Sequence, residues 1–363
     1  MVAAAAGLVA GAFAYKDTTI GIAKPRSAAG LMLDVVTSWD GNWYFEIIRH
    51  GYPRSVPHPI DYFQPEARAA FFPLYPLLVR GANWVLPGSD VSSALFVNLV
   101  LGAIVVVLVG LLARRLAGPK VASRAMILTC VFPGSFVLSF AYSEALMLAL
   151  AAGCLLALLD RRWLLAGVLA GFASATRPNA LALAVACLVA AVIAWRADGD
   201  RKAFVAPALA PIGFLLFQWY LGQHAGERGV WFRVQREAWG ERASFGGTVL
   251  RGTFRFLLHP FQSAPNAITA LCFVATIIGL VLLSKAKLPA PINAYTITIV
   301  VLMLSTATVT ARPRFLFTAF PLLIATAKVW HEDEHEWWGI VLAMCAAGLV
   351  TVTGLYGGIA AIP

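Results

Sequence analysis

Apolar runs close to 20 residues long recur along most of this chain, and they constrain its fold more than any other feature. A helix of that length matches the hydrocarbon thickness of a bilayer. Only 13% of the 363 residues are charged and 60% are hydrophobic, whereas a soluble domain carries about 25% charged residues. The alternating pattern of a membrane barrel is absent, which leaves the α-helix as the spanning element. The sequence therefore predicts an all-α polytopic membrane protein.

The predicted spans make the chain one integral membrane domain, residues 1–363, with two long polar segments. A short apolar helix precedes the first segment, 15–90, and the second segment is 223–264. Within the first, residues 34–50 have helical apolar spacing and are expected to lie along the membrane surface, and 71–86 is expected to be interfacial or re-entrant. With the first helix there are about eleven transmembrane helices. The other ten cover roughly residues 91–113, 121–140, 144–159, 163–177, 179–195, 204–222, 265–284, 289–309, 314–330 and 338–358.

Positive charge is concentrated in every second short loop. Loops rich in Lys and Arg stay on the cytoplasmic side, so both long polar segments are expected outside. The net charge of +10 then reflects topology and lipid head groups rather than nucleic acid. We expect a multi-pass plasma membrane protein with its functional groups on the external side. The basic loop residues are Arg114, Arg115, Lys120, Arg124, Arg161, Arg162, Arg196, Arg201, Lys202, Lys285 and Lys287.

The expected external side also holds Asp40, in the first polar segment, and charged residues at the ends of predicted spans, namely Glu144, Arg177, Arg312 and Arg314. Charges kept at a membrane boundary are candidates for function. A carboxylate can take the proton of an attacking hydroxyl as general base. Arginines can hold a phosphate through paired N–H donors and stabilise its charge as it leaves. We therefore interpret Asp40 as a catalytic base and the three arginines as ligands of a donor phosphate.

Each of these residues also has a structural interpretation. Asp40 could cap a surface helix that begins near Asn42, with the tryptophans around it as an interfacial belt. Glu144 could be favoured by a helix dipole, and the arginines could extend to lipid head groups. A basic loop could be solvated surface or contact substrate; it contains Arg233, Arg236, Arg242, Arg251 and Arg255.

The segment from His331 to His335 fits the H-E-x-x-H pattern of zinc proteases. That pattern needs a third protein ligand, usually downstream. No Asp, Glu or His follows Glu336, and Cys345 lies within an apolar run. We interpret the segment as a solvated acidic linker in a cytoplasmic loop and expect no metal there.

Several short motifs occur together in a fixed order: Trp39-Asp40-Gly41-Asn42-Trp43-Tyr44, His50-Gly51-Tyr52-Pro53, Phe71-Phe72-Pro73-Leu74-Tyr75-Pro76, Tyr142-Ser143-Glu144-Ala145-Leu146 and Thr176-Arg177-Pro178-Asn179. In combination they resemble the PIG-V family of mannosyltransferases, which belongs to the GT-C class. The resemblance covers residues 31–314 and departs from the family at Ala180, where a glycine is common.

The resemblance implies a GT-C fold and a polyprenyl-phosphate-mannose donor, from which a β-linked mannose is transferred with inversion on the external side. The catalytic acid of the first external loop corresponds to Asp40. The Ala-, Val- and Arg-rich composition resembles that of an actinomycete-like bacterium, so the expected acceptor is a lipid-linked glycan or glycolipid. The residues expected to contact substrate are Trp39, Asn42, Trp43, Tyr44, Tyr142, Glu144 and Asn179.

Two other functions remain open from the sequence. A flippase or transporter of lipid-linked sugars would also use external arginines, although it should show inverted repeats or charges in mid-membrane, and neither is evident. A non-catalytic GT-C-like partner subunit is the other. The sequence requires no cofactor, but Asp40 and Glu144 could share a divalent cation if the fold brings them together.

Overall fold

The computed structural model describes residues 28–260, 262–308, 311–329 and 335–357. The predicted first helix and residues 331–334 of the zinc-like motif lie outside these ranges. The described chain is built from helices, and its only strand-like pairing is an isolated bridge between Ala243 and Thr306. The prediction of an all-α protein is confirmed.

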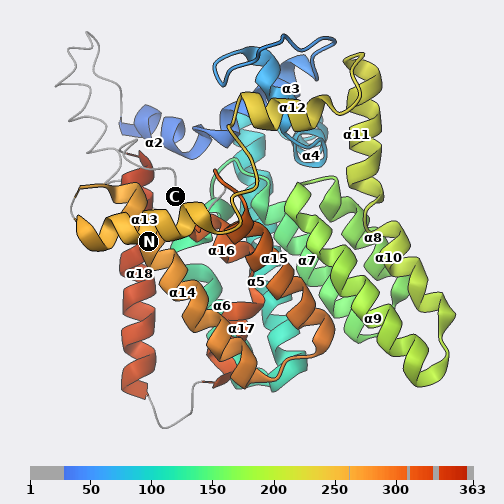
Figure 1. Cartoon of the computed structure of the whole chain (residues 1–363), viewed down its shortest axis with the longest axis vertical. Coiled ribbons are helices and arrows are strands. Elements are labelled where there is room, and N and C mark those ends of the chain that lie inside the picture. Colours follow the sequence, from blue (N-terminus) through green and yellow to red (C-terminus); the bar gives the residue numbers. More distant parts are fainter. Residues whose placement is uncertain (1–27, 261, 309–310, 330–334, 358–363) are drawn as a thin grey trace.

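The helices follow one another along the chain as Figure 1 shows. Their bounds are α2 Ala28–Thr37, α3 Asp40–His50, η1 Pro65–Ala70, α4 Leu74–Ala82, α5 Asp90–Ala117, α6 Pro119–Val131, η2 Pro133–Leu138, α7 Glu144–Leu159, α8 Trp163–Ser174, η3 Pro178–Leu181, α9 Ala182–Asp198, η4 Arg201–Phe204, α10 Val205–Leu209, α11 Ile212–His224, α12 Val230–Glu237, α13 Gly247–Leu258, α14 Ala264–Ala286, α15 Ala290–Ser305, α16 Pro313–Thr318, α17 Pro321–Val329 and α18 His335–Gly357. The η elements are short 3₁₀ helices.

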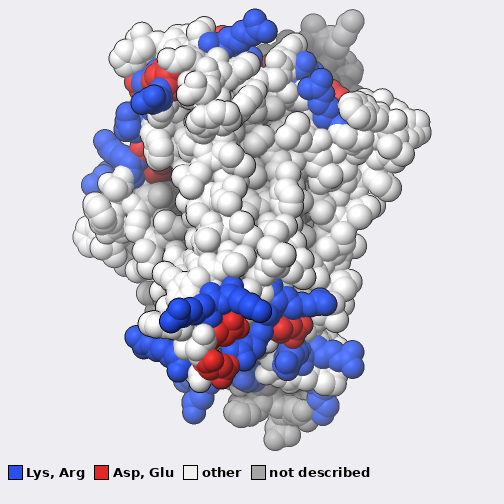
Figure 2. All heavy atoms as spheres, turned by 90° about the vertical axis from the view of Figure 1, so that its right-hand side faces the viewer, with Lys and Arg blue, Asp and Glu red and all other residues white. Residues whose placement is uncertain are grey.

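Five helical stretches of the described chain are long and apolar enough to cross a membrane. They are Asp90–Ala117, Pro178–Asp198, Arg201–His224, Ala264–Ala286 and Trp337–Tyr356. Figure 2 shows charged side chains gathered toward the two ends of one face, with a broad uncharged band between them. Large apolar side chains on the outer helix faces are exposed, among them Leu99, Leu164 and Leu271. A surface of this kind is stable only against lipid, so the chain is a multi-pass membrane protein.

Some predicted spans are shorter or interrupted in the structure. The run 121–140 stops being α-helical at Val131, because Pro133 opens the 3₁₀ helix η2. The run 204–222 is divided between α10 and α11 around Pro211, and 314–330 is divided between α16 and α17. Proline lacks the N–H that would continue the helical ladder, so hydropathy alone joins pieces that the backbone separates.

Helix α7 lies at the centre of the bundle and fixes its two ends. Its side chains are buried around most of its circumference, many of them alanines, which let neighbouring helices approach closely. Its first residue, Glu144, lies near α3. The loop after its last residue meets two other loops: Asp160 lies 3.7 Å from Arg115, and Arg161 is paired with Asp198. The basic loops after α5, α7 and α9 therefore share the end of the bundle opposite α3.

The end of the bundle near α3 is covered by short helices, with α2, α3, α4 and α12 above the long helices in Figure 1. The predicted surface helix 34–50 is in fact two helices, α2 and α3, with a turn at Ser38 and Trp39. The two long polar segments pack on each other through an apolar cluster that includes Phe72, Phe217 and Trp231. They therefore form one cap.

Candidate active site

The turn between α2 and α3 directs Asp40 into the protein. Trp39 precedes it with a φ of 58°, in the left-handed region that a non-glycine residue rarely adopts. Asp40 is the first residue of α3, and no side chain caps this helix. Gly41 packs closely against the segment that precedes α7, since a Cβ there would come within 3.4 Å of the Ala141 carbonyl oxygen. The capping interpretation of Asp40 is therefore not what the structure shows.

The carboxylate of Asp40 pairs with the guanidinium of Arg314, 274 residues away. Its Oδ2 lies 2.9 Å from Nη1 of Arg314, and the two side chains are 16% and 9% exposed. The same Nη1 lies 4.0 Å from Glu144 Oε1. Buried Nε of Arg314 has no hydrogen-bond partner. Arg314 thus stands between two carboxylates with one donor unused.

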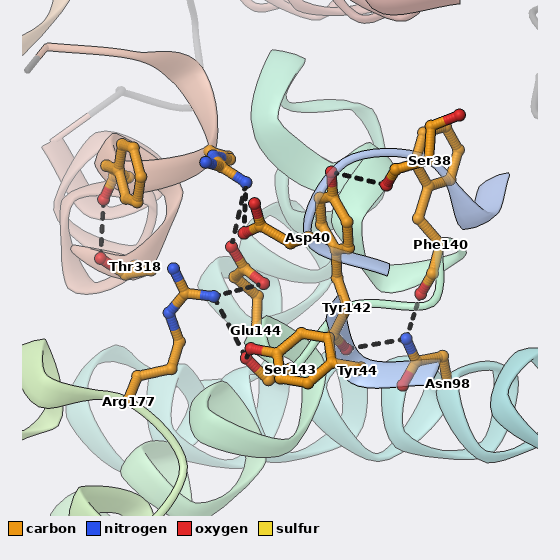
Figure 3. A network of polar contacts seen from close by, with 12 residues as sticks. Ser38, Asp40, Tyr44, Asn98, Phe140, Tyr142, Ser143, Glu144, Arg177 and Thr318 are labelled. Carbon is orange, nitrogen blue, oxygen red and sulfur yellow. Dashed lines mark hydrogen bonds and ion pairs between the residues drawn. The ribbon is translucent and has the colours of Figure 1, made fainter. Parts of the chain in front are cut away.

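Glu144 and Arg177 form a second pair beside the first. Glu144 Oε2 lies 2.9 Å from Nη1 of Arg177, and the Glu144 side chain is fully buried. Nη1 of Arg177 also donates to Ser143 Oγ over 3.1 Å, and Ser143 Oγ is 2.5 Å from the Tyr44 hydroxyl. Neither oxygen of Glu144 accepts a hydrogen bond of good geometry, so the ion pair is close but misaligned. Figure 3 shows Asp40, Glu144, Ser143 and Arg177 converging.

The charges of this cluster shift the pKa of its basic and phenolic members. Burial is the largest single influence on the pKa of Arg314 and lowers it, but Asp40, Tyr142 and Glu144 together outweigh burial and raise the pKa overall. Burial likewise opposes charge on Arg177, and Glu144 raises its pKa. Burial raises the pKa of Tyr44, so this phenol stays neutral as a hydrogen-bond partner. For Arg312, burial and the neighbouring Arg314 lower the pKa to about 10. Arg312 is therefore the guanidinium whose charge the surroundings favour least.

The structure brings most of the predicted site residues together but not all of them. Tyr142 lies under Arg314, whose guanidinium carbon is 5.6 Å from the ring centre, and it is fully buried. Trp39 packs on Tyr356, and Trp43 packs with Tyr62, Phe71 and Trp239. Asn42 is exposed. Asn179 is the second residue of η3 and has a buried Oδ1 without a hydrogen-bond partner.

Three residues that sequence reasoning missed join the cluster. Ser143 links Tyr44 to Arg177. Phe315 lies between the two arginines, its ring centre 4.6 Å from the guanidinium carbon of Arg314 and 6.0 Å from that of Arg177. Tyr356, on α18, hydrogen-bonds to Tyr142. The signal for Tyr356 was a single phenol near the end of an otherwise apolar span.

An apolar groove of about 600 Å³ opens beside the cluster, between α3 and α4 on one side and α8 and α11 on the other. Leu74 and Ala175 line it and are joined by a backbone hydrogen bond of 3.1 Å, two residues before Arg177. Helices α8 and α11 approach closely here, because a Cβ on Gly213 would overlap the Gly171 carbonyl. Arg80 also lines the groove and is its charged residue.

The cluster does not fit a divalent cation in this arrangement. The guanidinium of Arg314 lies between Asp40 and Glu144, at 2.9 and 4.0 Å from their oxygens, where a shared cation would have to sit. Within the described ranges no three His, Cys, Asp or Glu side chains gather as a metal site.

The architecture has counterparts among solved structures. The crystal structure of ArnT from Cupriavidus metallidurans bound to undecaprenyl phosphate matches with a TM-score of 0.55 at 16% identity, over 84% of this chain and 57% of that chain. Its apo form matches with a TM-score of 0.54 at 15% identity over the same shares. An oligosaccharyltransferase from Archaeoglobus fulgidus tethered with an acceptor peptide gives a TM-score of 0.47 at 13% identity, over 89% of this chain and 51% of that chain. The chain thus spans little more than half the length of these proteins. The fold is that of the GT-C membrane glycosyltransferases.

Part of the sequence resembles one particular family of transferases. Residues 23–198 match the family model described as "Mannosyltransferase (PIG-V)", so the resemblance to that family is confirmed. The matched residues include Asp40, Glu144 and Arg177. The match ends well short of Arg314, to which the predicted resemblance extends. Among curated proteins, none matches the sequence.

Proposed function

We propose that this protein is an inverting mannosyltransferase that moves mannose from a polyprenyl-phosphate-mannose donor to a hydroxyl of a lipid-linked glycan or glycolipid. One observation carries the proposal: a buried cluster of charged side chains is paired by charge but incompletely hydrogen-bonded. Nε of Arg314 and both oxygens of Glu144 lack hydrogen-bond partners. Buried polar groups are nearly always satisfied, so these atoms are suited to a ligand that brings both acceptors and hydroxyl donors. A sugar phosphate has both.

In this proposal the arginines hold the donor phosphate. Arg314 has an unused Nε donor, and Arg177 lies beside it across the Phe315 ring. An anion near Arg312 would offset the burial that lowers the pKa of that residue. Phosphate binding would draw the Arg314 guanidinium away from Asp40 and leave the carboxylate facing the acceptor hydroxyl.

Asp40 then acts as the general base. The acceptor oxygen attacks C1 of the mannosyl group as its proton passes to Asp40, and the bond from C1 to the phosphate oxygen breaks. The electron pair leaves with the polyprenyl phosphate, which the arginines stabilise. One displacement turns the β-linked donor into an α-mannoside. Tyr44, Tyr142 and Glu144 are buried. We therefore propose that the two tyrosines hold the other site residues in place, and that Glu144 contacts the substrate only by accepting a hydrogen bond from one of its hydroxyls.

The apolar groove suits the lipid part of the donor. It borders the residues next to Arg177, and its volume of about 600 Å³ lies in the range of small-ligand pockets. The ArnT structure was obtained with undecaprenyl phosphate, a lipid phosphate of this chemistry. We further propose that residues 1–363 form one membrane domain in the plasma membrane, with segments 15–90 and 223–264 and the active site on the external face.

The test is transfer of radiolabelled mannose from polyprenyl-phosphate mannose into a membrane lipid extract by the purified protein. Asp40→Asn should lower the rate by ~10³-fold, since loss of a general base costs about 10²- to 10⁴-fold. Glu46→Gln removes a carboxylate from the same helix and should transfer at the wild-type rate. Donor binding without transfer by the wild type would favour a flippase. Equal transfer by wild type and Asp40→Asn would remove Asp40 from the centre of the reaction.

A further inference from the structure

The carbonyl oxygen of Ser38, two residues before Asp40, receives hydrogen bonds from distant parts of the chain. The hydroxyl of Tyr356 lies 3.1 Å from it and that of Tyr142 lies 3.4 Å from it. The amide of Gly41 also donates to it, over 3.2 Å. The two phenols are hydrogen-bonded to each other. Figure 3 shows Ser38 and Tyr142 on the side of Asp40 away from Arg177.

The number of hydroxyl hydrogens decides which phenol donates to the Ser38 carbonyl. Three contacts join the two hydroxyls and the Ser38 carbonyl, but two hydroxyls supply only two hydrogens. The shorter distance to Ser38 is that of Tyr356. Tyr356 therefore donates to Ser38, and Tyr142 donates to the oxygen of Tyr356. Loss of the Tyr356 hydroxyl leaves the carbonyl with the Gly41 amide and the longer phenol contact, whereas loss of the Tyr142 hydroxyl leaves the shorter phenol contact in place.

The carbonyl held in this way belongs to the peptide that sets the φ of Trp39. A positive φ is strained for a non-glycine residue and persists only where the surroundings impose it. The Trp39 ring also packs on Tyr356, with ring centres 6.4 Å apart. Upstream, the Ala141 amide holds the Val36 carbonyl over 2.9 Å. The turn that directs Asp40 toward Arg314 is thus fixed by α18, a helix that follows Arg314 in the chain.

We propose that Tyr356 is a positioning residue, which holds the Ser38–Trp39 peptide so that Asp40 meets Arg314 and, on the proposed function, the acceptor hydroxyl. The chemistry of the site is unchanged by its loss; the alignment of the base is what it supplies. Displacing a catalytic group by about 1 Å can cost up to ~100-fold in rate. Because the Gly41 amide and the Tyr142 hydroxyl can still reach the carbonyl, we expect a smaller loss of ~10-fold for Tyr356→Phe.

Two measurements on the full-length protein in detergent test this. The first is mannose transfer from polyprenyl-phosphate mannose into the membrane lipid extract. Tyr356→Phe should lower kcat ~10-fold with the donor KM unchanged, and Tyr142→Phe should have a smaller effect. The second is amide hydrogen exchange, which should accelerate in residues 37–45 of Tyr356→Phe and not elsewhere. Tyr295→Phe is the matched control, since Tyr295 is a buried phenol that donates 2.8 Å to the Thr318 carbonyl; it should leave both readouts as in the wild type.

The outcomes separate this proposal from the proposed function. Wild-type exchange and kcat in Tyr356→Phe would overturn the positioning role, as would a larger effect of Tyr142→Phe. Exchange accelerated throughout the protein would also overturn it, since the phenol would then hold the whole fold. If the wild type transfers no mannose, the proposed function fails, and faster exchange confined to residues 37–45 would still support the role of Tyr356.

Discussion

Two arginine–carboxylate networks lie toward the α3 end of this protein, one within the cap and one where the cap meets α7 and α16, and they differ in how completely they are hydrogen-bonded. Arg233 on α12 donates to both oxygens of Glu227, to Glu237, and to the carbonyls of Val56 and Pro57. Its fork of five N–H donors is fully used. Arg314 contacts Asp40 and approaches Glu144, but its Nε has no partner.

On the proposed function, the difference separates a structural role for Arg233 from a ligand-binding role for Arg314. The network of Arg233 joins the second polar segment to residues 56 and 57 of the first, and it leaves no donor for a ligand. The network of Arg314 is more buried, with Glu144 fully enclosed, and yet it is the less satisfied of the two. Burying incompletely bonded charge costs free energy, and a protein retains such a site where a ligand completes it.

Among the changes that test this comparison, the largest effect on mannose transfer is expected from changing the donor geometry of Arg314. Arg314→Lys keeps the charge next to Asp40 but removes the planar donors that bind phosphate bidentately. We expect mannose transfer to fall ~100-fold, in line with loss of a preorganised donor, while the melting temperature changes little. The measurement is transfer from polyprenyl-phosphate mannose, paired with thermal unfolding in detergent.

Arg49→Lys is the control for that substitution. Arg49 and Asp90 also form an Arg–Asp pair at 2.9 Å, but the Arg49 side chain is 50% exposed, and exposed pairs contribute little. The control should transfer at the wild-type rate. If Arg314→Lys transfers as well as Arg49→Lys, the fork of Arg314 has no part in phosphate binding.

An intermediate effect is expected at Arg233, on stability rather than on transfer. Arg233→Gln removes charge-assisted hydrogen bonds from a side chain that is 12% exposed, and we expect the free energy of unfolding to fall by about 2 kcal/mol. The transfer rate at a temperature where the variant is folded should stay within ~2-fold of the wild type. A loss of transfer without a loss of stability would place Arg233 in the site and erase the distinction between the two networks.

The sequence predicts the bundle and the charged members of the site for physical reasons that are local. Apolar runs and basic loops follow from the cost of polar groups in lipid. Glu144, Arg177 and Arg314 are charges at the ends of predicted spans, and Asp40 is a charge among aromatic residues in the first polar segment. Which of them pair is not local, because Arg314 meets Asp40 across 274 residues. The sequence spacing predicted neither that contact nor the one between Tyr356 and Ser38.

Adjacency within a motif is also a poor guide to adjacency in space. Asn42 follows Asp40 by two residues, but on a helix that step turns a side chain by about 200°, and Asn42 is exposed. Trp43 is three residues on and stays on the side of Asp40, where it packs with Phe71 and Trp239. The left-handed turn at Trp39 carries no sequence signature, since glycine, which marks such turns, is absent from that position.

The smallest expected effect is the pH dependence that the Arg233 network gives to the melting temperature. Hydrogen bonds from Arg233 lower the pKa of Glu227. Burial opposes ionisation of Glu237, but hydrogen bonds from Ile60, His58 and Arg233 lower its pKa overall. A carboxyl whose folded pKa lies below its unfolded value stabilises the fold above the unfolded pKa, about 4.3 for Glu, and that stabilisation is lost as pH falls through the folded pKa. Both pairs are partly exposed, so we expect a change in melting temperature of only ~2 °C between pH 5 and pH 3. Arg233→Gln should reduce that acid-dependent change, and an undiminished change in the variant would mean that other carboxylates cause it.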